Sequence, residues 1–104
     1  FDEIDQGIGG RVGDIVGRKL WGLAAKGGHQ VIIVTHLPQL AAYGDAHLQV
    51  SKAVHDGRTT TQIQNLNRGG RINELAAMLG TDRQTGVEGA KSILNHVQGV
   101  KSPV

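Results

Sequence analysis

The chain has 104 residues, a formal net charge of +2 and no cysteine, so it can form at most one domain with a modest core and has neither a disulfide framework nor cysteine metal ligands. Its 11 basic and 9 acidic residues are too evenly balanced to predict a nucleic-acid-binding patch from charge alone. No apolar run approaches the length of a membrane span, so we expect no membrane partner.

The first ten residues place two adjacent carboxylates, Asp2 and Glu3, and then Asp5 before a glycine-rich loop. One apolar residue followed by Asp-Glu is typical of a buried strand that delivers two acids to a site. Neighbouring side chains of an extended chain point to opposite faces, so one carboxylate can serve a metal ion while the other accepts a proton from water. The alternative is a solvated acidic terminus. A start at Phe1 without Met fits a fragment whose preceding strand is missing.

After the loop we expect a helix from about Arg11 to Ala25, because apolar residues recur at helical spacing. The apolar stripe consists of Val12, Ile15, Val16, Leu20, Leu23 and Ala24. Gly13 and Gly17 lie inside this helix, each at a cost of about 1 kcal/mol relative to alanine. They are either simply tolerated or allow close packing on a sheet. Lys26 and the two glycines after it predict the end of the helix.

Residues 30–35 are almost wholly apolar and β-branched, the pattern of a strand buried on both faces. An acidic strand end, a helix and a buried strand form a βαβ unit, so we expect two parallel strands with a right-handed crossover. Ligands of such sheets bind beyond the carboxyl ends of the strands. This geometry would bring Asp2, Glu3 and His36 to one crevice. The alternative for His36 is a hydrogen-bonding role at the end of a strand.

The middle of the chain predicts a short helix and a β-hairpin. Pro38 suits the first turn of a helix that ends near Tyr43. Two strands, over 47–54 and 58–66, then follow on either side of Asp56-Gly57, which is a strong short-range indication of a hairpin turn.

The last third of the chain predicts a turn and two helices. Residues 67–70 should form the turn, and a short amphipathic helix over 72–79 should end at Gly80. A polar linker over 81–86 leads to a last helix over 87–97, and residues 99–104 form a tail. Four histidines, His29, His36, His47 and His55, invite a metal-site interpretation. None is paired with another at i, i+4 spacing and no cysteine joins them, so we predict no histidine-built metal site.

Three stretches together resemble the carboxy-terminal part of the RecN family: the acidic motif over 1–5, the loop over 7–12, and the run Thr35-His36-Leu37-Pro38-Gln39. These are bacterial DNA double-strand-break repair ATPases, related to SMC proteins and more distantly to ABC transporter ATPases. The resemblance continues to about Ala77. It implies an α/β fold over 1–98: a partial P-loop NTPase (ABC-type) head with parallel strands, flanking helices, a β-hairpin and C-terminal helices, followed by the tail.

The resemblance also implies ATP and Mg²⁺ as cofactors and assigns roles to the candidate residues. Asp2 would hold Mg²⁺ through water, Glu3 would be the general base, and His36 would contact the γ-phosphate as the switch histidine. The D-loop, which crosses toward the nucleotide of a partner head, matches Gly7, Ile8, Gly9 and Gly10. SMC and transporter ATPases usually have Leu-Asp where Ile8-Gly9 stands, so the usual D-loop aspartate has no counterpart here.

The phosphate loop and the signature segment of such ATPases are absent from these residues. The resemblance therefore implies ATP hydrolysis by the intact protein and no activity of this chain alone. The implied partners are a second head in a homodimer, the missing amino-terminal half of the head, and DNA, in the cytoplasm at the nucleoid. Two alternatives remain: a non-catalytic interaction module, and a head fragment of another SMC-type or ABC-type ATPase.

Overall fold

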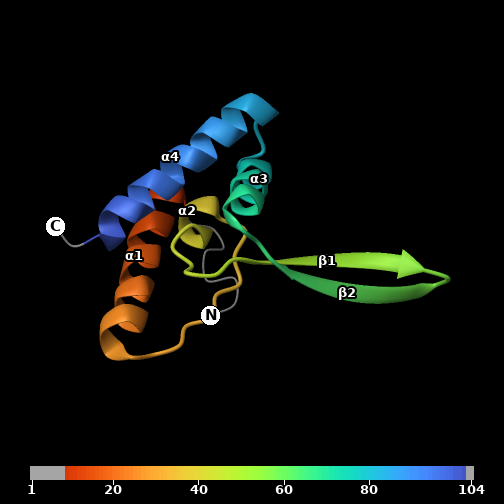
Figure 1. The fold of residues 1–104 in the computed structure, drawn as a ribbon, viewed down its shortest axis with the longest axis horizontal. Helices are drawn as coiled ribbons and strands as arrows, with labels where there is room; N and C mark the ends of the chain where they lie inside the picture. Colours follow the sequence, from red (N-terminus) through yellow and green to blue (C-terminus); the bar gives the residue numbers. More distant parts are fainter. Residues whose placement is uncertain (1–8, 103–104) are drawn as a thin grey trace.

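The structure is a computed structural model and describes residues 9–102. This range contains four helices and two strands, which are, in chain order, α1 (Gly10–Gly27), α2 (Pro38–Ala41), β1 (Leu48–His55), β2 (Arg58–Asn65), α3 (Arg68–Leu79) and α4 (Arg83–Lys101). The helices gather into one body, and the two strands form a hairpin that projects from it (Figure 1). No described helix is both long enough and apolar enough to cross a membrane.

The predicted hairpin is confirmed. β1 and β2 pair antiparallel, from Leu48 opposite Asn65 to His55 opposite Arg58. The two turn residues, Asp56 and Gly57, have φ angles of 51° and 75°. A two-residue hairpin turn of type I′ requires positive φ at both central residues, so the Asp-Gly pair determines the turn.

The core lies where α3 and α4 pack on the residues that follow α2 (Figure 1). Its buried hydrophobic residues are Ala42, Tyr43, Leu75, Ala76, Ala90, Leu94 and Val97. Leu40 and Leu75 are the largest side chains that are fully buried, and Trp21 of α1 packs against the edge of this cluster. Helix packing, and not a sheet, therefore organises the described part of the chain.

The predicted α/β architecture, a partial P-loop NTPase head with parallel strands, is wrong for the residues that the structure describes. Their one sheet is the antiparallel pair β1–β2. Residues 31–33 lie outside any strand, and Val34 forms only an isolated bridge. A β-branched run becomes a buried parallel strand only where neighbouring strands and covering helices enclose it. Here Ile32 and Val34 remain 69% and 53% exposed. The other strand of the predicted βαβ unit lies outside the described residues.

The predicted first helix is confirmed, and it ends at Gly28, whose φ of 68° is left-handed. The face that it buries is different from the predicted apolar stripe. Val12, Ile15 and Leu23 are 45–48% exposed, whereas the buried residues of α1 are Gly13 and Gly17. The row of small residues is therefore the packing face of α1.

Both C-terminal helices begin earlier than predicted, because a polar side chain caps each of them. The predicted turn at 67–70 contains the cap of α3, where the Asn67 side chain accepts a hydrogen bond from the Gly70 N–H at 2.8 Å. In the predicted linker, Asp82 caps α4 and accepts from the Thr85 N–H at 3.0 Å. Such side chains replace the missing partners of the first helical N–H groups. α4 then continues through Lys101, while the division into a head portion and a tail stays a prediction.

Candidate functional site

The start of α1 and His36 are the parts of the predicted site that the structure describes. Gly9 caps the helix in an extended conformation without a side-chain hydrogen bond, and the first turn contains no acidic residue. The Gly13 N–H donates to the Gly9 carbonyl at 2.9 Å. Of the predicted D-loop, only Gly9 and Gly10 are described. The candidates Asp2, Glu3, Gly7 and Ile8 lie outside the described residues, so their roles stay predictions.

A row of glycines on α1 allows the segment over 37–43 to approach the helix closely. A Cβ atom built at Gly10 would lie 2.8 Å from the Gln39 Cδ atom, and one at Gly17 would lie 2.5 Å from the Tyr43 Cδ2 atom. A Cβ at Gly13 would collide with Leu37. Carbon atoms in van der Waals contact lie at about 3.5–4.0 Å, so none of these three positions has room for a side chain without movement of its neighbour.

His36 stands directly before this close contact. It lies in a bend and is exposed, and the next residue, Leu37, donates its N–H to the Thr35 Oγ1 atom at 3.0 Å. Leu37 and Gln39 both pack on the first turns of α1. The fold therefore brings the segment that contains His36 to the helix that begins at Gly10. Its position relative to Asp2 and Glu3 is not part of the described geometry.

A polar cluster that the sequence did not predict lies on α1, one turn after Gly10. The Tyr43 hydroxyl donates to the Asp14 Oδ1 atom at 2.6 Å, and the His96 Nε2 atom lies 3.1 Å from the same oxygen. Arg18 approaches the other carboxylate oxygen at 4.0 Å. Only the Asp14–Arg18 pair has a sequence indication, because its i, i+4 spacing places both on one helical face. The other two partners come from distant parts of the chain.

This cluster shifts the pKa values of two of its members. Burial pushes the pKa of Asp14 upward, but hydrogen bonds from Tyr43 and His96 and the positive charges nearby outweigh it, so this pKa is lowered. Burial, followed by the hydrogen bond to Asp14, raises the pKa of Tyr43 above 10.0. The carboxylate is therefore ionised and the phenol neutral at neutral pH.

His47, at the base of the hairpin, is partly buried. Burial, helped by the positive charge of Arg71, lowers its pKa below 6.5, so its imidazole is neutral at neutral pH. Arg71 in turn donates to the Ala42 carbonyl at 3.2 Å, and Gln49 of β1 donates to Glu74 of α3. Within residues 9–102, no three His, Cys, Asp or Glu side chains are grouped so that they could hold a metal ion.

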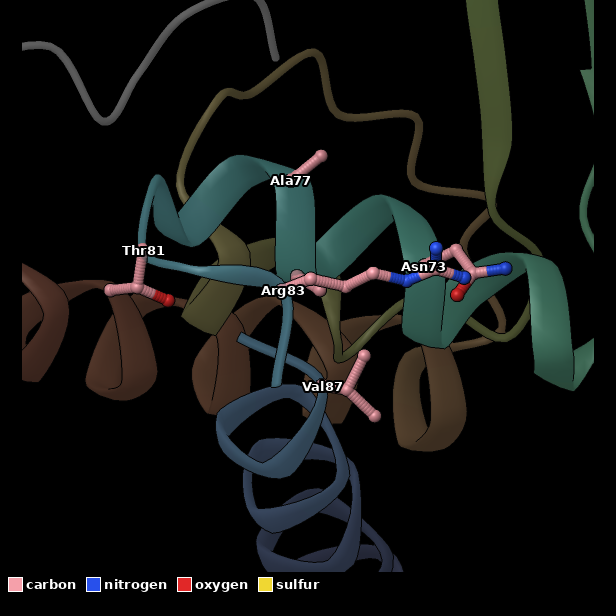
Figure 2. A pocket seen from close by; sticks show the side chains of 6 residues that line it. Asn73, Ala77, Thr81, Arg83 and Val87 are labelled. Atoms are coloured by element: carbon pink, nitrogen blue, oxygen red, sulfur yellow. The ribbon is translucent and has the colours of Figure 1, made fainter. Parts of the chain in front are cut away.

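A separate open pocket lies at the turn between α3 and α4 and contains none of the predicted site residues. It is lined by Asn73, Ala76, Ala77, Thr81, Arg83 and Val87. Figure 2 shows the Arg83 side chain extending along α3 toward Asn73. The neighbouring Asp82 carboxylate already accepts the Thr85 N–H in the first turn of α4, so this helix start is not an open anion site.

Comparisons with known proteins find relatives that share a name, although no family model matches the chain. The DNA repair protein RecN of Xylella fastidiosa is 52% identical over 80 residues, which are 77% of this chain and 14% of that protein. RecN of Mycobacterium tuberculosis is 44% identical over 100 residues (94% and 16%), and RecN of Bacillus subtilis is 36% identical over 104 residues (98% and 18%). The chain thus spans less than a fifth of these relatives. It belongs to the RecN family of DNA repair proteins, as a homologue of one segment of them.

Proposed function

We propose that this segment is part of an ATP-hydrolysing head that acts in DNA double-strand-break repair and recombination. The observation that carries the proposal is the similarity to RecN, which extends over 77–98% of the chain. The relatives are named as DNA repair proteins. The assignment of ATP hydrolysis rests on the resemblance of the acidic motif over 1–5 and the run over 35–39 to those of the RecN family.

In this proposal each candidate residue has one role. Asp2 holds Mg²⁺ through water, and Glu3 accepts the proton of the attacking water. His36 donates a hydrogen bond to the γ-phosphate. When bound, Mg²⁺ would neutralise the charge that develops on the phosphoryl oxygens. Glu3 needs no contact with the metal ion, because Asp2, on the opposite face of the extended chain, provides that contact.

The start of α1 is compatible with a phosphate nearby. Its first turn contains no acidic side chain, and its N-cap residue, Gly9, has no side chain that could cap the helix. The N-terminus of a helix carries a partial positive charge and favours anions. A D-loop that ends at Gly10 would therefore meet the nucleotide of a second head without repulsion from the helix that follows it.

The remaining partners in the proposal are those of the whole protein. A second head forms a homodimer across the D-loops, the amino-terminal half of the head supplies the phosphate loop and its Lys, and DNA is the substrate of repair in the cytoplasm. The 104-residue chain alone is expected to be inactive, because it lacks the groups that hold the β- and γ-phosphates.

The experiment that tests this assignment replaces His36 with alanine in a RecN-length chain that contains this segment. Losing a contact made mainly as charge moves in the transition state lowers turnover more than nucleotide affinity. We expect turnover to fall by roughly 10²–10³-fold, with little change in the dissociation constant for ATP. His55→Ala is the matched control, since His55 is also exposed but lies at the hairpin turn. Full turnover of His36→Ala would mean that His36 has a structural role.

One observation favours the second candidate function, an interaction module without catalysis. The register of the hairpin places Leu48, Val50 and Val54 of β1 and Ile63 of β2 on one face, and these side chains are 56–69% exposed. An exposed apolar face of this kind commonly marks an interface. ATP turnover that is unaffected by changes at both Glu3 and His36 would favour this alternative.

A further inference from the structure

Asp14 connects three parts of the fold through one oxygen atom. It lies on α1, its Oδ1 atom accepts the Tyr43 hydroxyl at 2.6 Å, and the same atom lies 3.1 Å from the Nε2 atom of His96 on α4. The Asp14 side chain is 26% exposed and that of His96 is 54% exposed. Tyr43 follows α2, which begins two residues after His36. The Asp14–Tyr43 hydrogen bond therefore fixes α1 relative to the segment that contains His36.

α4 reaches α1 at a second point, through Lys101. The Nζ atom of Lys101 lies 5.7 Å from the centre of the Trp21 ring and 2.9 Å from the Asp45 Oδ1 atom. A lysine ammonium keeps its charge over the physiological pH range, whereas histidine is the side chain that ordinarily changes charge between about pH 5 and 8. Of these two attachments of α4 to α1, the His96 contact is therefore the one that can respond to a proton.

Charged and polar side chains of α1 and of the segment after α2 face His96 or the carboxylate that it contacts. Asp14 faces it from α1 at hydrogen-bond distance, and Tyr43 faces the same carboxylate as a neutral phenol. Arg18 is the opposing charge, at 4.0 Å from the other carboxylate oxygen and with a side chain that is 56% exposed. A direct charge-assisted hydrogen bond is stronger than a longer exposed contact. A proton on His96 should thus tighten the contact between α4 and α1.

We propose that Asp14 is a positioning residue for the candidate site, and that protonation of His96 strengthens the attachment of α4 to the Asp14–Tyr43 pair. The attachment itself is a property of the 104-residue fold. Its link to catalysis rests on the proposed function, because it matters there only if His36 and the start of α1 act together on a nucleotide. The test therefore has one part for each claim.

The first part measures urea unfolding of the 104-residue chain at about pH 5.5 and about pH 8 for the wild type, His96→Gln, Asp14→Asn and the double variant. His96→Gln should lower the midpoint more at the lower pH, by roughly 0.1–0.5 M, as expected for an exposed ion pair. In the Asp14→Asn background this pH dependence should disappear. His55→Gln serves as the control for loss of an exposed histidine. Equal losses at both pH values, or a pH dependence that persists in the Asp14→Asn background, would overturn the proposal.

The second part measures ATP turnover of a RecN-length chain that contains this segment. Asp14→Ala removes both the acceptor of the Tyr43 hydroxyl and the charge beside His96, whereas Tyr43→Phe removes only the hydroxyl that binds Asp14. We expect both variants to lower kcat with an unchanged KM, because the segment that contains His36 is then less firmly held on α1. If Glu3→Gln abolishes turnover while both variants keep the wild-type kcat, the positioning role is wrong. If Glu3→Gln keeps wild-type turnover, the proposed function fails instead, and the unfolding result stands independently.

Discussion

Two glycine-to-alanine substitutions within α1 test whether its glycine row is a packing face. Gly17 faces the Tyr43 ring, where a Cβ atom would lie 2.5 Å from Cδ2 and 3.1 Å from both Cγ and Cε2. Gly22 lies in the same helix, and a Cβ atom there would meet nothing within 4 Å. Because alanine is about 1 kcal/mol more favourable than glycine inside a helix, both substitutions gain this propensity and only Gly17→Ala introduces a collision.

The size of the collision follows from the surroundings of Tyr43. Tyr43 is only 3% exposed and its hydroxyl is bound to Asp14, so the ring must shift by about 1 Å to restore an ordinary carbon–carbon contact. Overpacking of this kind costs about 1–3 kcal/mol, and a weakened hydrogen bond adds about 1 kcal/mol. After the gain in propensity, Gly17→Ala should destabilise the chain by about 1–3 kcal/mol, whereas Gly22→Ala should stabilise it by up to about 1 kcal/mol.

Urea unfolding followed by circular dichroism measures both variants, with the fluorescence of the single tryptophan, Trp21, as a second probe. We expect the unfolding midpoint to fall by about 1 M for Gly17→Ala and to rise by a few tenths of a molar for Gly22→Ala, given a slope of about 1–3 kcal/mol per molar urea. Equal stabilisation by the two substitutions would show that Tyr43 does not pack against Gly17, and the described attachment of α1 would then be wrong.

Two further predictions concern pH and helix capping. Burial and Arg71 lower the pKa of His47, so the unfolded chain takes up a proton at a higher pH than the folded chain. The free energy of unfolding should therefore be unaffected by His47 above about pH 6.5 and fall as the pH drops below it. A His47→Gln variant that shows the same loss at low pH would contradict this cause. Asn67→Ala removes the 2.8 Å hydrogen bond to the Gly70 N–H and should cost about 0.5–2 kcal/mol in thermal or urea unfolding, whereas an unchanged stability would mean that Asn67 does not cap α3.

Local chemistry explains what could be predicted of the fold. The hairpin follows from Asp56-Gly57, because few residue pairs adopt positive φ at both positions. The ends of α1 and α3 follow from Gly28 and Gly80, both of which are left-handed. α4 begins earlier than the predicted residue 87 because Asp82, which lies in the predicted linker, caps it; Asp is a preferred residue at this position.

The errors concern features that depend on distant parts of the chain. The apolar run over 31–34 has the composition of a buried strand, but composition does not supply the neighbouring strands, and Ile32 stays 69% exposed. The sequence left open whether Gly13 and Gly17 are tolerated or allow close packing on a sheet; they do allow close packing, but against the segment over 37–43. For the site, the sequence predicts roles for His36 and for the loop over 7–10, and these roles stay predictions; among the described residues, Leu37 and Gln39 pack on the first turns of α1. The sequence could not identify the Asp14 cluster, because Tyr43 and His96 are 29 and 82 residues away.

The central claim, that this segment belongs to an ATP-hydrolysing head, is tested most directly by the turnover of Glu3→Gln in a RecN-length chain that contains it. Glutamine keeps the shape of the side chain but cannot accept a proton from water at neutral pH. We predict a fall of roughly 10²–10⁴-fold in the rate of phosphate release, with ATP binding retained and a dimer that accumulates in light scattering with Mg-ATP. Asp5→Asn, a nearby carboxylate without an assigned role, is the matched control. A Glu3→Gln variant that releases phosphate at the wild-type rate would contradict the account.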